Sequence, residues 1–151
     1  LVTVRRMVLD LSFSTVIVGV PIVREVDGLA LSSRNIYLDP RHREAARSIS
    51  RGLFAASVAV MAGERSAREL EGIVSAAVDE EAGIDLDYAT LADQDTAAPV
   101  ATLDRPVFLA AAARVGSTRL LDNIHIDPHE GGWMPDIGTR LQEPSILYRE
   151  A

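Results

Sequence analysis

The sequence contains no cysteine and no lysine, so its 15 basic residues other than histidine are all arginines. Without cysteine there is no disulfide framework and no thiolate metal site, which fits a cytoplasmic protein. No apolar run approaches the roughly 20 residues that a membrane-spanning helix needs, and no signal peptide is visible. We therefore expect a cytoplasmic protein with no membrane partner.

Positive charge is also scarce, because 22 acidic residues against 15 basic ones give a net charge of −7. This balance argues against non-specific binding to nucleic acid or to an anionic membrane, but it is compatible with a local basic pocket. Hydrophobic residues make up 48% of the chain and charged residues 25%, proportions typical of a globular protein with a core. The length of 151 residues suits one domain or part of a larger protein.

The stretch from Val16 to Leu38 holds most of the information about function. Val16–Val18 is short, β-branched and without alternation, a pattern that predicts a buried strand of a parallel sheet. Pro21 ends this strand because it cannot donate a ladder hydrogen bond. The chain then resumes an extended conformation and turns at Asp27-Gly28, where glycine takes a positive φ at little cost.

A cluster of Ser32, Ser33 and Arg34 follows this turn, directly before the next helix. Two hydroxyls and a guanidinium suit an anion, since arginine offers a planar fork of donors that matches phosphate oxygens. The alternative is structural: Ser32 or Ser33 caps a short helix and Arg34 is solvated. The residue types and their spacing leave both interpretations open.

Helices are predicted where apolar residues recur at intervals of three and four and where capping residues stand at the ends. The first spans Leu1 to Leu11. The second is opened by Asp39-Pro40 and stopped by Gly63, and the third starts at Ser66, which forms a capping box with Glu69.

Strand signals follow the helices. Residues 84–91 alternate, with Ile84, Leu86 and Tyr88 on one side and aspartates on the other, which predicts a half-buried antiparallel strand. Further along, two apolar segments flank the turn signal Gly116-Ser117 and predict a hairpin of residues 107–115 and 118–126.

The second hairpin strand carries polar residues in an apolar context. Arg119, Asp122 and Asn123 would pair across the strands or face solvent, or Asp122-Asn123 would be buried and hold the strand against a neighbour. From Asp127 the composition shifts to several proline and glycine residues without a clear period, which predicts a loosely ordered tail. Trp133 is the residue of this tail that we expect to dock on the domain.

Two blocks of the chain resemble the pantothenate synthetase (pantoate–β-alanine ligase) family. They are VGVPIVRE-x-DGLALSSRN-x-YLDP and, at residues 113–126, ARVGSTRLLDNIHI. The resemblance runs from about Leu1 to Ile126. In that family the Ser-Ser-Arg cluster takes the part of the KMSKS loop of class I aminoacyl-tRNA synthetases and related nucleotidylyl transferases.

The resemblance implies an α+β fold in which the end of a Rossmann-like parallel sheet is followed by helices packed on a small antiparallel sheet. The chain would divide into the end of the nucleotide-binding domain (residues 1–38), a C-terminal α+β domain (39–126) and the tail (127–151). Part of the family fold would then lie upstream of Leu1. Dimers are typical of the family, so a homodimer is one alternative for the oligomeric state.

The implied reaction is ATP-dependent condensation of pantoate with β-alanine through pantoyl adenylate, giving pantothenate, AMP and pyrophosphate. The implied ligands are ATP with Mg²⁺, pantoate and β-alanine. Ser32, Ser33 and Arg34 would contact the phosphates, Leu31 would wall the adenosine side, and the Val23 backbone would read the adenine edge. No side chain of this sequence is assigned as a metal ligand.

The chain departs from the family in what it lacks. The family's HIGH-like histidine motif has no counterpart, because His42, His125 and His129 stand in other contexts. The family's lysine has no counterpart either, because the sequence contains no lysine. We therefore expect the C-terminal part of such an enzyme, inactive alone. The alternatives are another KMSKS-type nucleotidyl transferase, against which the second block argues, and a truncated gene product without catalysis.

Overall fold

The computed structural model describes residues 1–145, which form an α+β arrangement of helices and two small sheets. The elements in chain order are α1 (Val2–Asp10), β1 (Val23–Arg24), the 3₁₀ helix η1 (Ser33–Tyr37), α2 (Pro40–Met61), α3 (Ala67–Asp79), β2 (Ile84–Asp93), β3 (Val107–Val115), β4 (Thr118–His129), β5 (Gly132–Asp136) and β6 (Thr139–Arg140).

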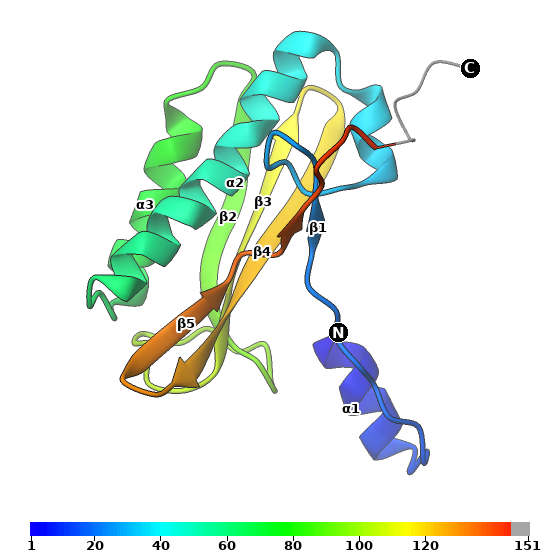
Figure 1. Ribbon diagram of the computed structural model, residues 1–151, viewed down its shortest axis with the longest axis vertical. Coiled ribbons are helices and arrows are strands. Elements are labelled where there is room, and N and C mark those ends of the chain that lie inside the picture. Colours follow the sequence, from blue (N-terminus) through cyan, green and yellow to red (C-terminus); the bar gives the residue numbers. More distant parts are fainter. Residues whose placement is uncertain (146–151) are drawn as a thin grey trace.

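The larger sheet is antiparallel, with strand order β2-β3-β4-β5, and the smaller one pairs β1 with β6 in parallel. Helices α2 and α3 cover one face of the larger sheet, as Figure 1 shows. The predicted fold class, helices packed on a small antiparallel sheet, is therefore confirmed.

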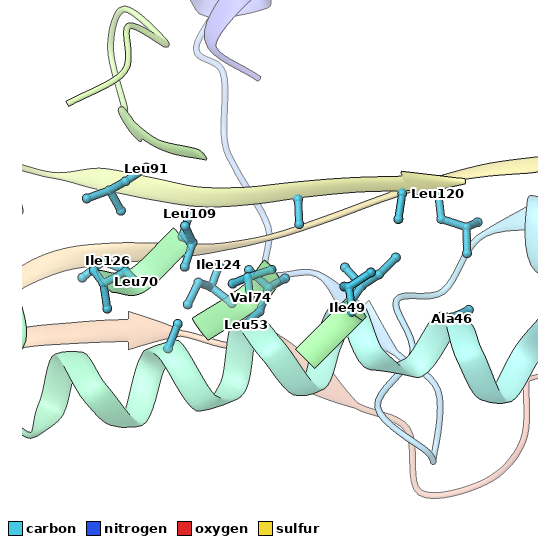
Figure 2. Close-up of a cluster of buried hydrophobic side chains, with 14 of the residues drawn as sticks. Ala46, Ile49, Leu53, Leu70, Val74, Leu91, Leu109, Leu120, Ile124 and Ile126 are labelled. Atoms are coloured by element: carbon cyan, nitrogen blue, oxygen red, sulfur yellow. The ribbon is translucent and has the colours of Figure 1, made fainter. Parts of the chain in front are cut away.

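The core lies between the larger sheet and the two helices that cover it (Figure 2). The apolar stripes predicted from the sequence supply its helical side. The fully buried large side chains include Ile49 and Leu53 from α2, Leu70 and Val74 from α3, Leu91 and Leu109 from β2 and β3, and Ile124 and Ile126 from β4.

Both long helices begin where their capping residues predict. The Asp39 side chain accepts a hydrogen bond from the His42 backbone N–H at 2.8 Å, and Ser66 accepts one from Glu69 at 3.5 Å. The helices cross closely at Gly52, where an added Cβ would lie only 2.9 Å from the Val74 Cα. A side chain at position 52 would push α2 and α3 apart.

Strand β2 differs from its predicted alternation. Ile84 is buried and Leu86 is half-buried, as expected, but Tyr88 is 39% exposed, so its predicted place on the buried side is wrong. The cause is a register shift between Leu86 and Tyr88 in the pairing with β3. A bulge adds one residue to the strand and reverses the facing of every residue after it.

The hairpin of β3 and β4 turns at Gly116, whose φ is 56°, as predicted. The prediction of a loosely ordered tail from Asp127 is wrong for residues 127–140. They form the end of β4 and the whole of β5 and β6. Trp133 packs against the core, as expected. These strands were missed because they are formed by pairing with neighbouring strands, which does not require a regular apolar period in the sequence. Residues 146–151 of that tail lie outside the described part.

The N-terminal segment confirms one prediction and contradicts another. Helix α1 forms within residues 1–11, without a buried residue, and Figure 1 shows it apart from the helix-sheet body. The predicted buried strand at Val16–Val18 is absent, and Val16 is 82% exposed. Within residues 1–145 nothing pairs with this segment; the parallel pairing starts only at Val23. No described helix combines the length and apolarity that crossing a membrane requires.

Candidate functional site

Arg24 uses all five N–H groups of its guanidinium to connect the candidate loop (residues 24–35) with β4 and with the segment between β5 and β6. Two bonds reach the Asp122 carboxylate, from Nη1 to Oδ2 at 2.6 Å and from Nη2 to Oδ1 at 3.0 Å. The other three reach the carbonyls of Gly28 at 3.3 Å, Asn123 at 3.3 Å and Ile137 at 2.5 Å. Every donor that an arginine side chain possesses is thereby used.

This ion pair lies in the interior, with Arg24 1% and Asp122 5% exposed. Burial raises the pKa of the Asp122 carboxyl above its ordinary value, and the hydrogen bonds from Arg24 act in the opposite direction. Both carboxylate oxygens accept bonds from a permanently charged group, which stabilises the ionised form of Asp122. The ring of Phe54 lies 4.9 Å from the guanidinium carbon. Of the alternatives for Asp122 in the sequence analysis, burial against a neighbouring segment is therefore correct.

Between β1 and η1 the chain folds back in a tight turn. The Glu25 N–H donates to the Leu29 carbonyl at 2.8 Å, and the Leu31 N–H donates to the Val23 carbonyl at 2.9 Å. Gly28 has a φ of +93°, the positive value predicted for the Asp-Gly turn. Val23 and Leu31 thus lie paired at the base of the turn.

The Ser-Ser-Arg cluster begins η1. The Ser32 hydroxyl accepts a hydrogen bond from the Arg34 backbone N–H at 3.2 Å, so the structural role allowed by the sequence is present. A hydroxyl that accepts one bond can still donate its own proton. The Arg34 side chain reaches β4, where its Nη1 donates to the Arg119 carbonyl at 3.2 Å. Buried Asn35 anchors the loop by donating to the Ala30 carbonyl at 2.9 Å.

A cavity of about 150 Å³ lies between this loop and β4. Of the residues proposed from the sequence, Ser32 and Arg34 line it. Ser33 is exposed, and Val23, Leu31 and Ser33 are not among the lining residues. The lining comprises Leu29, Ala30, Ser32, Arg34 and Asn35 from the loop, Ile49 from α2, and residues 119–122 from β4.

Arg119 is the neighbour of the cluster that the sequence analysis did not assign to the site. Its Nε donates to Asp87 Oδ2 at 2.5 Å, and this bond is the first cause that raises the pKa of the Arg119 guanidinium. Together with Arg34 it lines both the cavity and a wider depression of about 460 Å³. Only the membership of Arg119 in the second resembling block could have pointed to it.

The structure is an α+β domain with a small cavity of mixed apolar and polar lining, and Ser32, Arg34 and Arg119 are the hydroxyl and guanidinium residues among its lining, donors of the kind that suit an anion. Comparison with known proteins gives a more specific result. The family model described as Pantoate-beta-alanine ligase matches residues 1–125. The chain belongs to this family, and the match covers the loop and nearly all of the second block.

Relatives with curated names agree. Pantothenate synthetase of Citrifermentans bemidjiense is 47% identical over 123 residues, covering 82% of this chain and 44% of the relative. The protein of the same name from Desulforapulum autotrophicum is 46% identical over 127 residues, covering 84% and 45%. The chain thus spans less than half the length of these relatives.

A solved structure has the same fold. The crystal structure of pantothenate synthetase from Thermus thermophilus superposes with a TM-score of 0.78 at 36% sequence identity. The superposition covers 84% of this chain and 46% of that one. The family match ends at residue 125, so the end of β4 and all of β5 and β6, which lie within residues 126–140, are outside it.

Proposed function

We propose that this chain is the phosphate-binding C-terminal part of an ATP-dependent pantoate–β-alanine ligase, which joins pantoate to β-alanine through pantoyl adenylate. The observation that carries the proposal is the placement of Ser32 and Arg34 around one cavity in a chain of this family. The substrates are ATP, pantoate and β-alanine, without a nucleic-acid or membrane partner. The protein is cytoplasmic, and a homodimer, typical of the family, is compatible with the proposal.

The roles follow from the donors that each residue offers. Arg34 presents a guanidinium fork to phosphate oxygens, and the Ser32 and Ser33 hydroxyls add neutral donors. Donors that are fixed before the reaction lower the cost of the charge that develops during displacement. Leu31 walls the adenosine side, and the Val23 backbone reads the adenine edge. The Val23 carbonyl already accepts from Leu31, so this readout uses its remaining hydrogen-bonding capacity.

At this site Mg²⁺ would be held mainly by the phosphate oxygens of bound ATP and by water. Within residues 1–145 no group of three or more histidine, aspartate and glutamate side chains is arranged to hold a metal ion. Mg²⁺ is commonly held by phosphate oxygens and water with one or two carboxylates. When bound with ATP it supplies charge neutralisation on the phosphates, and Arg34 and the serine hydroxyls of this chain hold the oxygens that remain.

Isothermal titration calorimetry with ATP and Mg²⁺ tests the proposal. Arg34→Ala should weaken binding about tenfold or more, the loss expected for one charge-assisted hydrogen-bonding group. Arg68→Ala is the matched control, because Arg68 is an exposed arginine of α3 outside the cavity lining. Equal affinity in the Arg34→Ala and wild-type chains would contradict the proposal, as would a folded wild-type chain that does not bind ATP.

A further inference from the structure

We propose that Arg119 is a second phosphate-binding residue of this site, and that with Arg34 it selects a di- or triphosphate over a monophosphate. The inference rests on the proposed function, since it assigns a further residue to the same anion-binding loop. The ligand class is a chain of linked phosphoryl groups.

The two arginines come from different elements, and the Arg34 side chain contacts the Arg119 backbone, while the Arg119 side chain pairs with Asp87 of β2. Arg34 belongs to η1 and Arg119 to β4, and the Arg34 Nη1 lies 3.2 Å from the Arg119 carbonyl oxygen. Both residues line the cavity of about 150 Å³ and the adjoining depression of about 460 Å³. They therefore stand at the boundary between two neighbouring spaces.

The Arg119 guanidinium is held in place without using up its donors. Asp87 accepts from Nε, and within the described residues the terminal nitrogens make no hydrogen bond, which leaves four N–H groups for a ligand. The side chain is 44% exposed. A donor that is already oriented loses less conformational entropy on binding than a free surface arginine.

Two guanidinium groups match two phosphoryl groups. One arginine fork pairs with the oxygens of one phosphoryl group in a bidentate manner. A monophosphate can be satisfied by Arg34 and Ser32, whereas the next phosphoryl group of a longer chain needs a second cation. The depression also includes Ser117 and Tyr37, whose hydroxyls are further neutral donors.

The test uses the full chain and two probes, inorganic pyrophosphate and inorganic phosphate, by calorimetry at low ionic strength, where exposed charges are least screened. Arg119→Ala should weaken pyrophosphate binding about tenfold and leave phosphate binding within about twofold. Arg119→Lys keeps the charge but not the fork and should give an intermediate loss. Arg114→Ala is the matched control, because Arg114 faces Arg119 across β3 and β4, is exposed, and lines neither space.

Arg119→Ala binding pyrophosphate as tightly as the wild type would overturn the inference, and so would an equal loss in Arg114→Ala. A loss in Arg34→Ala alone would overturn this inference and leave the proposed function standing. If the wild type binds neither probe, or if neither Arg119→Ala nor Arg34→Ala weakens binding, both the inference and the proposed function fail.

A second measurement avoids variants altogether. In ¹H–¹⁵N spectra of the unmodified chain, pyrophosphate should shift the Nε–H signals of Arg34 and Arg119 but not that of Arg114. An unshifted Arg119 signal at saturation would count against the inference.

Discussion

A single buried arginine determines how the candidate loop is attached to the rest of the molecule. Arg24 reaches Asp122 on β4, Gly28 in the turn and Ile137 near β6 with one side chain. A buried ion pair repays its desolvation only when its remaining hydrogen-bonding groups are also satisfied. Here all five guanidinium donors are used, so the pair is a defined connection between segments distant in sequence.

Asp122→Ala should therefore unfold the chain at a much lower denaturant concentration. The Arg24 guanidinium would remain buried without its counter-charge, which costs about 3–5 kcal/mol. Urea titration followed by circular dichroism measures the change in midpoint at constant slope. Asp85→Asn, at an exposed position of β2, is the control and should change stability by less than about 0.5 kcal/mol.

The double variant Arg24→Met, Asp122→Leu tests the reason for this loss. Replacing both charges by apolar groups removes the unpaired charge, so it should recover much of the stability lost in Asp122→Ala. A double variant no more stable than Asp122→Ala would show that shape, and not the unpaired charge, is responsible.

Helix α2 is the element that joins the loop to the core. Two residues separate it from the end of η1, and it packs on the sheet through Ile49 and Leu53 and crosses α3 at Gly52. Its start is specified locally by Asp39, whose pKa is lowered, first because its carboxylate accepts the His42 backbone N–H. The position of the loop against β4 therefore depends on where this helix begins.

The Asp39 cap should make stability depend on pH in the acid range. The folded-state pKa lies below the unfolded value of about 3.9, so the stabilisation is present above pH 4 and is lost as the pH falls through the depressed pKa. Asp39→Asn caps the helix without titrating. Thermal melting from pH 6 to pH 2 should show a steeper fall for the wild type, and parallel curves would contradict the role of Asp39.

At the scale of the whole molecule, the segment beyond the family match returns to the candidate loop. Strand β6 pairs with β1 through the Thr139 N–H to the Ile22 carbonyl at 2.7 Å and the Leu141 N–H to the Arg24 carbonyl at 2.8 Å. The antiparallel sheet, the loop and this returning strand thus form one connected unit. Helix α1 contributes no buried residue to it.

The isolated chain should make no pantothenate. By resemblance, the family's histidine motif and lysine have no counterpart in this sequence, so the groups that would complete catalysis are not supplied. The chain is incubated with ATP, Mg²⁺, pantoate and β-alanine, and pantothenate and AMP are measured by mass spectrometry. The Thermus thermophilus relative serves as the positive control. Pantothenate formed by the pure chain, and lost in Arg34→Ala, would contradict this expectation.

Much of the fold follows from signals that act over a few residues. Caps at Asp39 and Ser66, the positive φ at Gly28 and the apolar stripes of α2 and α3 depend on near neighbours in the sequence, so they could be predicted. The hairpin and the family were also recognisable. The Val16–Val18 strand was not correct, because a strand needs a partner and apolar composition does not provide one.

The candidate site, like the fold, has features that the sequence could predict and features that it could not. By itself, the sequence determined the family to which the chain belongs and identified Ser32, Ser33 and Arg34 as candidates for phosphate contact. Only the tertiary structure decided that Arg34 meets Arg119 across 85 residues and that Arg24 meets Asp122 across 98. These contacts depend on strand register and helix packing. Residue spacing alone cannot specify them, because a shift of one residue in register turns a side chain to the opposite face.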